Sequence, residues 1–321
     1  MAFFPAHVPA PLPALNFLRR NLFPRWRAAV ILWLGMVALQ VASPAPMRAA
    51  EPYFFIQLTD PQFGFMAANA NFEQETANFE FAVATVNRLR PAFVVITGDL
   101  VHLPGDPAQI AEYRRIAAKI DRAIPVYEVA GNHDVENVPT PETLRKYTQL
   151  FGPDHYTFRH QGLVGIVLNS CLIHSPQQTP EQMAGQERWL KAELEKAKAE
   201  RAQHIVVFQH HSWFLKTADE PDSYSNIPLE RRATYLALFR NYGVKYLFSG
   251  HYHRNAIARV GDIEAVTTGP VGKPLGPADE RRSGLRVAIV RDNRIEHEFH
   301  DFSRLPNRIE LAPPPPKKTA R

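Results

Sequence analysis

Five short segments of the sequence carry side chains that bind metal ions or transfer protons. They combine carboxylates, amides and imidazoles, and they read Asp60-Pro61-Gln62, Gly98-Asp99, Gly131-Asn132-His133-Asp134, His210-His211 and Gly250-His251-Tyr252-His253. Oxygen and imidazole donors suit Mn, Fe, Zn, Ni or Co, and one carboxylate can bridge two ions. Two ions about 3.5–4 Å apart can clamp the attacking and leaving oxygens of a displacement at phosphorus. The residue types therefore favour a site for two divalent metal ions that supports hydrolysis of a phosphate ester.

Each segment follows a short apolar run that predicts a β-strand. The five runs are residues 53–58, 93–97, 126–129, 204–208 and 245–248. Because the carboxyl ends of the strands in an open α/β sheet share one edge, where ligands gather, we expect the five segments to converge there. The glycines before Asp99, Asn132 and His251 would let the backbone turn sharply beside the ions.

The regions between these strands predict helices and further strands. Residues 74–89 repeat apolar side chains at spacings of three and four, which is typical of a helix, and Pro91 would end it. Asp106 and Pro107 suit the N-cap and the first position of a helix over 107–120. The other predicted helices are 140–151, 181–200 and 228–242, and the other predicted strands are 155–158, 163–168, 256–260, 263–267, 285–290 and 295–300. This order predicts an α/β fold with one mixed sheet or two sheets.

The composition argues against nucleic-acid binding and against cysteine chemistry. The formal net charge is +5, but five arginines and no Lys, Asp or Glu precede Glu51, so residues 51–321 have a formal charge of zero. A neutral body offers no electrostatic attraction for DNA, and no nucleic-acid partner is expected. Cys171 is the one cysteine of the chain, which excludes an intramolecular disulfide and a thiolate metal cluster.

Residues 1–50 are predicted to be an N-terminal export signal or a signal anchor. The run Arg19-Arg20-Asn21-Leu22-Phe23 resembles a twin-arginine signal, and an apolar stretch over 28–42 follows it. That stretch is short for a bilayer span, which needs about 20 residues, and both a cleaved signal and an uncleaved anchor remain open. Either way we expect a periplasmic or secreted domain, attached to the membrane only if the leader is retained. We place this domain at 51–305 and a disordered Pro/Lys-rich tail at 306–321.

The order of the five segments resembles the calcineurin-like metallophosphoesterase family, over roughly residues 53–255. A branch of that family that includes serine/threonine-protein phosphatases is more similar still, on the segments 60–64, 98–102, 209–211 and 248–255. The resemblance implies a four-layer α-β-β-α sandwich of two mixed β-sheets flanked by helices. It also implies a hydrolase that uses two divalent metal ions (Mn, Fe, Zn, Ni or Co) and a hydroxide between them as the nucleophile.

The same resemblance implies a role for each ligand-type residue. Asp60 and His253 would bind the first metal ion, and Asp99 would bridge both ions. The implied ligands of the second ion are Asn132, His210 and His251.

The resemblance also implies the catalytic and substrate-binding residues. His133 would act as a general acid or stabilise transition-state charge, and Asp134 would hold its ring in position. Asn132, His133 and Arg254 are the candidate contacts to the substrate. That substrate is expected to be a phosphorylated small molecule or a phosphoprotein, and the sequence makes no prediction of oligomeric state.

Gln62 departs from the family pattern, which usually has a histidine ligand at this position. A glutamine carbonyl oxygen is a harder and weaker donor than imidazole. Either Gln62 still binds the first ion through its oxygen, or that ion is held more loosely. The second alternative leaves open a catalytically weak pseudo-phosphatase that binds metal and recognises phosphorylated ligands.

Seven of the other histidines are interpreted as surface or packing residues. They are His102, His155, His160, His174, His204, His297 and His300. His211 is ambiguous beside His210, and His210 is the favoured ligand. The acidic segment 219–224 is interpreted as a solvated loop, with a border of the substrate cleft as the alternative.

Overall fold

The computed structural model describes residues 51–312 of the chain. The predicted leader at 1–50 and the end of the predicted tail at 313–321 lie outside the described residues. Between residues 51 and 312, none of the helices is both long enough and apolar enough to cross a membrane.

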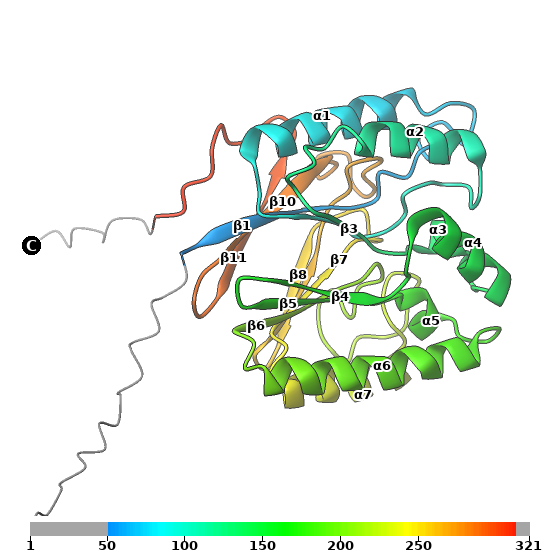
Figure 1. The fold of residues 1–321 in the computed structure, drawn as a ribbon. Helices are drawn as coiled ribbons and strands as arrows, with labels where there is room; N and C mark the ends of the chain where they lie inside the picture. Colours follow the sequence, from blue (N-terminus) through cyan, green and yellow to red (C-terminus); the bar gives the residue numbers. More distant parts are fainter. Residues whose placement is uncertain (1–50, 313–321) are drawn as a thin grey trace, which may run out of the picture. The chain divides into compact units, whose positions relative to one another are not determined.

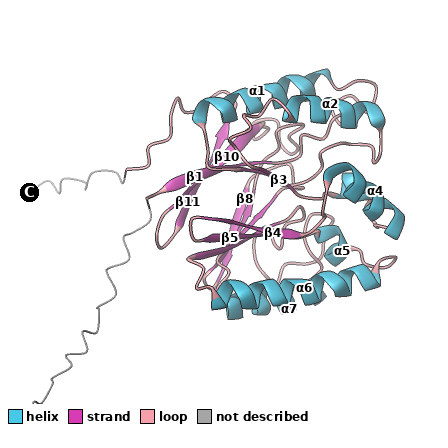
Figure 2. Cartoon of the chain, viewed as in Figure 1, coloured by secondary structure: helices cyan, strands magenta, loops and turns pink. Residues whose placement is uncertain are grey.

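Two mixed β-sheets form the centre of the described domain (Figure 2). The first sheet has the strand order β11 (Ile295–Asp301), β10 (Gly284–Val290), β1 (Tyr53–Leu58), β2 (Val94–Ile96) and β3 (Val126–Glu128). In it β1, β2 and β3 are parallel, and β10 and β11 continue the sheet in antiparallel register. The second sheet has the order β4 (Tyr156–His160), β5 (Leu163–Val167), β6 (His204–Phe208), β7 (Tyr246–Ser249), β9 (Ile263–Thr267) and β8 (Ala256–Val260). Its four inner strands are parallel, with antiparallel β4 and β8 at the edges.

Aromatic side chains fill the space between the two sheets. The Phe55 ring of β1 lies edge-on against Phe208 of β6 and Phe248 of β7, with ring centroids 5.6 and 5.4 Å apart. Phe93 stacks on Phe55 at 4.9 Å, and all four rings are buried. Removing a ring of this size from water stabilises a fold by about 1.5–3 kcal/mol. This apolar contact fixes the sheets face to face, so that the loops at the carboxyl ends of their parallel strands meet.

Helices cover the outer face of each sheet (Figure 1). The helices are α1 (Glu73–Leu89) and α2 (Pro107–Ala117) on the first sheet, and α6 (Pro180–Ala199) and α7 (Leu229–Tyr242) on the second. Phe79 and Tyr113 join α1 and α2 to the core of the first sheet, and Leu190 and Phe239 join α6 and α7 to the core of the second. The structure is therefore a four-layer α-β-β-α sandwich, which confirms the predicted fold class.

The predicted helix signals act as expected at α2. The Asp106 carboxylate accepts a hydrogen bond of 2.9 Å from the backbone N–H of Gln109, and Pro107 occupies the first helical position. Both features stabilise a helix start, because the first N–H groups lack partners within the helix. Helix α4 (Pro141–Phe151) begins similarly, with Thr140 accepting from Thr143 at 3.1 Å.

Two short helices were not expected from the sequence. They are α3 (Asn132–Val135) and α5 (Ser170–His174). Each is about one turn long, and a single turn shows no apolar periodicity that a sequence pattern could reveal. Helix α3 matters most, because it coils the segment that carries three of the predicted site residues.

The chain beyond the predicted boundary at residue 305 contacts the rest of the domain. Ile309 and Leu311 pack against the core of the first sheet, and Arg291 donates a hydrogen bond of 2.8 Å to the Leu311 carbonyl. Arg88 also donates to the carbonyls of Pro306 and Asn307. Residues 306–311 thus contact the domain through two partly buried apolar side chains, and the predicted boundary at 305 stays a prediction.

Candidate metal centre

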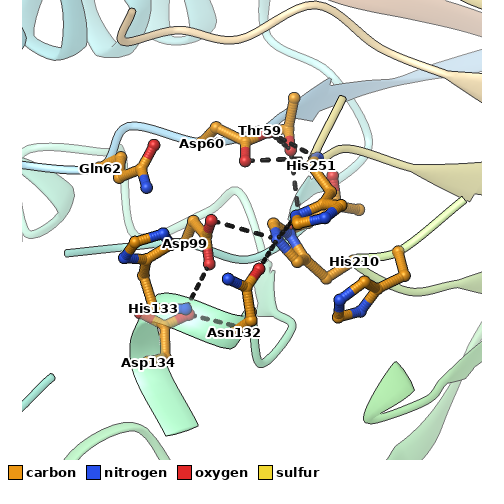
Figure 3. A network of polar contacts seen from close by, with 12 residues as sticks. Thr59, Asp60, Gln62, Asp99, Asn132, His133, Asp134, His210 and His251 are labelled. Carbon is orange, nitrogen blue, oxygen red and sulfur yellow. Dashed lines mark hydrogen bonds and ion pairs between the residues drawn. The ribbon is translucent and has the colours of Figure 1, made fainter. Parts of the chain in front are cut away.

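The five predicted segments converge at one edge of the sandwich, beyond the carboxyl ends of β1, β2, β3, β6 and β7 (Figure 3). Side-chain ligand atoms of Asp60, Asp99 and His253 all lie within 4.8 Å of one another, and so do those of Asp99, His210 and His251. All five side chains are buried. Asp99 belongs to both groups, which is the arrangement that a carboxylate bridging two ions requires.

Close contacts define the cluster further. The His210 Nε2 atom lies 3.2 Å from Asp99 Oδ2, 3.0 Å from Asn132 Oδ1 and 3.1 Å from His251 Nδ1. On the other side, His253 Nε2 lies 3.4 Å from Asp60 Oδ1. In the six predicted ligands other than Gln62, the atoms that would bind the metal ions therefore lie close together.

Each imidazole in the cluster uses one ring nitrogen to contact a backbone carbonyl and turns the other nitrogen inward. The carbonyl partners are Thr97 for His210 at 2.8 Å, Tyr224 for His251 at 2.8 Å and Lys273 for His253 at 2.6 Å. A second hydrogen bond of this kind fixes the tautomer and orientation of metal-binding histidines. In the neutral form of each ring, the inward nitrogen is then the one without a proton, which can bind a cation.

The backbone adopts a left-handed conformation at several of these residues. The φ angles are 49° at Asp60, 41° at Gln62, 50° at Asp99, 66° at His251 and 55° at His253. Residues other than glycine rarely adopt this region, and each such residue costs about 1–3 kcal/mol. The backbone strain therefore occurs at residues whose side chains are directed towards the ligand cluster.

Glycines allow the site loops to approach one another. A Cβ atom on Gly131 would overlap the Asp99 carboxylate, and a Cβ atom on Gly250 would overlap the Thr59 hydroxyl beside Asp60. Neither glycine needs positive φ, so the requirement at both is space rather than conformation. The glycines noted in the sequence therefore permit the packing of Asp99 and Asp60 against neighbouring loops.

Burial and mutual charge set the protonation of the cluster. Burial disfavours the charged form of His210, but the Asp99 carboxylate at 3.2 Å outweighs it and raises the pKa of His210 to about 9. Burial also disfavours ionised Asp99, and the His210 cation outweighs it and lowers the pKa of Asp99. Burial and the His210 cation together lower the pKa of His251 to about 3. Without a metal ion, His210 is thus the cation that balances Asp99.

Gln62 provides the test of whether the site suits a metal ion. Its Oε1 atom is buried and has no hydrogen-bond partner among the described residues, while Nε2 lies 3.4 Å from His102 Nδ1. A buried polar atom without a partner costs about 1–3 kcal/mol. An unpartnered, buried carbonyl oxygen two residues after the ligand candidate Asp60 suits a divalent cation, so the residues present fit the two metal ions that the chemistry calls for.

His133 and Asp134 are held by contacts to the backbone of neighbouring loops and to Asp99. The His133 backbone N–H donates to Asp99 Oδ1 at 2.8 Å, and its Nδ1 atom lies 2.7 Å from the His102 carbonyl. Asp134 accepts backbone N–H bonds from Gly131 at 2.8 Å and Leu100 at 2.9 Å. The carboxylate fastens two loops, and the His102 carbonyl orients the imidazole. The predicted role of Asp134 in holding the His133 ring stays a prediction.

Three residues that the sequence analysis did not assign to the site lie next to it. His102 stacks on His133 with ring centroids 4.7 Å apart, so it is not a plain surface residue. The hydroxyl of Tyr224, in the segment interpreted as a solvated loop, accepts a hydrogen bond of 2.9 Å from Asn132 Nδ2. His211 is buried with Nδ1 3.0 Å from Ser170 Oγ, and its ring lies against His251. His102 had a signal in its proximity to Asp99, and the alternative that segment 219–224 borders the substrate cleft was the signal for Tyr224.

Arg254 follows the ligand candidate His253 in the sequence, and its described contacts are with residues outside the ligand cluster. Its guanidinium lies 4.3 Å above the Tyr252 ring and 3.9 Å from the Glu280 carboxylate. With Lys216 it lines a neighbouring pocket of about 420 Å³. The predicted contact between Arg254 and the substrate stays a prediction.

Two stacked mixed sheets that present buried carboxylate, amide and imidazole donors at a shared edge define a metal-dependent hydrolase. A family model described as calcineurin-like phosphoesterase matches residues 55–255. The serine/threonine-protein phosphatase CPPED1 of Homo sapiens is 36% identical over 270 residues, covering 79% of this chain and 85% of that protein. Its namesake from Danio rerio is 36% identical over 272 residues, covering 80% and 87%. The chain therefore belongs to the calcineurin-like phosphoesterase family and is a hydrolase of phosphoric ester bonds.

Solved structures share the fold at low sequence identity. Purple acid phosphatase PPD1 from Lupinus luteus matches with a TM-score of 0.58 and 14% identity, over 82% of this chain and 53% of that one. A dimetal phosphatase from Danio rerio matches with a TM-score of 0.52 and 15% identity, over 78% of this chain and 99% of that one. At this identity the similarity establishes the common architecture.

The pKa of His210, about 9, leads to a prediction for metal binding. A bound ion must displace the proton of His210, because only the neutral imidazole is a ligand. The apparent affinity for Mn²⁺ should therefore rise from pH 6 towards 9, by up to about tenfold per pH unit, and then level off. Calorimetric titration of the metal-free chain, in two buffers of different ionisation enthalpy, would measure both the affinity and the protons released. The variant His300→Gln, altered on β11, should keep this dependence, and an affinity that is constant over the range would contradict the prediction.

Proposed function

We propose that this hydrolase removes phosphate from monoesters, on a phosphoprotein or a small molecule, with two divalent metal ions that share Asp99. The observation that carries the proposal is the position of Asp99 within 4.8 Å of both ligand groups. The proposed ligands of the first ion are Asp60, Gln62, Asp99 and His253, and those of the second are Asp99, Asn132, His210 and His251. The names of the curated relatives support the phosphoprotein as one substrate class.

When bound, two such ions supply Lewis acidity to the phosphate oxygens and lower the pKa of the attacking water. The protein would contribute the proton donor from His133. With Nδ1 of His133 hydrogen-bonded to the His102 carbonyl, Nε2 of His133 carries a proton only in the cationic form. In that form Nε2 can protonate the leaving oxygen, and the Asn132 and His133 side chains border the position of the phosphate.

The experiment that tests the proposal uses p-nitrophenyl phosphate as a substrate. The purified chain with added Mn²⁺ should hydrolyse it, and Asp99→Asn should remove most of the activity because both ions lose a shared ligand. His133→Ala should lower kcat by about 10²–10⁴-fold, the usual contribution of a general acid. Asp262→Asn, in the turn between β8 and β9, is the matched control and should retain full activity. Turnover that is equal in wild type and Asp99→Asn would refute the proposal.

The alternative function is a weak enzyme that binds phosphorylated ligands. Gln62 supports this alternative, because its oxygen is a poorer metal ligand than imidazole. Replacing Gln62 by His should raise the affinity of the first ion by about tenfold, and replacing it by Leu should lower this affinity by about 10–100-fold. Metal content after dialysis against graded Mn²⁺ concentrations would measure both changes. Equal metal content in Gln62→Leu and wild type would show that the oxygen is not a ligand. Tight phosphate binding by a fully metallated chain without turnover would favour the alternative.

We also propose that the protein acts outside the cytoplasm, in the periplasm or secreted. The paired Arg19 and Arg20 and the apolar stretch over 28–42 support this location. The double variant Arg19→Lys/Arg20→Lys should accumulate in the cytoplasm, as measured by cell fractionation and blotting. Arg25→Lys/Arg27→Lys is the matched control and should be exported. Unchanged export of the first variant would rule out the twin-arginine route.

A further inference from the structure

The Asn132 side chain can bind a metal ion only through one of its two ends. An asparagine amide has a carbonyl oxygen that accepts and a nitrogen that donates, and the two ends have nearly the same shape. Rotating the amide by half a turn would direct its N–H groups at the metal ion, and the positively polarised hydrogens would be repelled by that ion. Asn132 therefore needs neighbours that distinguish its oxygen from its nitrogen.

The structure supplies those neighbours from two distant parts of the chain. The Nδ2 atom of Asn132 lies 2.9 Å from Asn137 Oδ1 and 2.9 Å from the Tyr224 hydroxyl. That hydroxyl in turn donates to Asn137 Oδ1 at 3.2 Å. The three groups close a triangle in which every donor has an acceptor. Turning the Asn132 amide over would set its oxygen against the Asn137 oxygen, so the triangle holds Oδ1 of Asn132 towards His210 at 3.0 Å.

We propose that Tyr224 and Asn137 are positioning residues that fix the Asn132 amide with its oxygen towards the second metal ion. The inference rests on the proposed two-metal function. It adds two residues that no ligand motif contains, and it assigns the exposed Tyr224 ring, 57% accessible, to the site.

Tyr224 acts on a second ligand through its backbone. Its carbonyl accepts a hydrogen bond of 2.8 Å from His251 Nε2, which leaves Nδ1 facing the cluster, and the two rings lie 4.6 Å apart. The side chain of Tyr224 thus orients Asn132, while its main chain orients His251. A Phe substitution removes the first contact and retains the second, so the two effects can be separated.

The segment that carries Tyr224 is held from beneath by a buried arginine. Arg232 of α7 is fully buried and donates to the carbonyls of Ala218 at 3.0 Å, Glu220 at 2.8 Å and Ile227 at 2.8 Å. The Glu220 carboxylate accepts from the N–H of Leu215 at 2.8 Å and closes the loop on itself. The loop is therefore fixed before any metal arrives, although the Tyr224 ring faces solvent.

The first experiment titrates the metal-free full chain with Mn²⁺ by calorimetry. Wild type should bind two ions, and Tyr224→Phe should weaken one of them by about 10–100-fold, the usual effect of losing a residue that orients a ligand. Asn137→Leu should do the same, while Asn137→Asp keeps an acceptor for Nδ2 and should bind like wild type. Tyr242→Phe is the matched control, because its hydroxyl contacts Glu195 at 3.2 Å, away from the site. The metal-free melting temperatures of Tyr224→Phe and Tyr242→Phe should match that of wild type.

The second experiment tests whether the contact between Tyr224 and Asn132 affects metal binding by orienting the Asn132 amide. Asn132→Asp replaces the amide by a carboxylate with two equivalent oxygens, which needs no neighbour to choose between them. In that background Tyr224→Phe should change Mn²⁺ affinity less than threefold. Equal losses in both backgrounds, or no loss from Tyr224→Phe in the wild-type background, would overturn the inference.

These outcomes are distinguishable from failure of the proposed function. A wild-type chain that binds two Mn²⁺ ions without hydrolysing any phosphate ester would remove the proposed function and leave the positioning role intact. Wild-type affinity in Tyr224→Phe would remove the positioning role whatever the activity. A wild-type chain that binds fewer than two ions would overturn both.

Discussion

The buried carboxylate of Asp99 is the group on which the rest of the site depends. It lies in both ligand groups, pairs with His210 and accepts the backbone N–H of His133. An anion removed from water is stable only when cations or strong donors surround it. The left-handed backbone at Asp99 and the missing side chain at Gly131 both serve to place this carboxylate where two loops and two sheets meet.

The surroundings of Asp99 are rigid for electrostatic as well as steric reasons. Imidazoles tied to backbone carbonyls cannot turn away, so the cluster keeps its donor atoms inward even when it holds protons in place of metal ions. The cation on His210 balances Asp99 in that state. A bound metal ion would therefore replace the proton of His210 as the positive charge beside Asp99. The backbone contacts of the imidazoles would hold the ligand side chains in place during this exchange.

The sequence predicted the fold class and the convergence of the ligands because each motif directly follows an apolar strand, as Asp60 follows β1 and His210 follows β6. It carried no signal for the backbone contacts of Asp134 with Gly131 and Leu100, which depend on the single helical turn of α3. Nor did it predict the contact between Tyr224 and Asn132, which is 92 residues away, because a buried arginine sets the position of Tyr224. Local patterns encode strand ends and caps, whereas contacts between distant loops depend on tertiary packing.

Both proposed ions would draw ligands from both sheets, since Asp60, Asp99 and Asn132 follow strands of the first sheet and the three histidines follow strands of the second. The ions would thus connect the two sheets at one edge of the sandwich. Elsewhere the sheets are held together by contacts between phenylalanine rings. A ligand present at a hundred times its dissociation constant adds about 2.7 kcal/mol to the stability of the folded form. The metal supply of the compartment in which the chain folds would then set how firmly its two halves are joined.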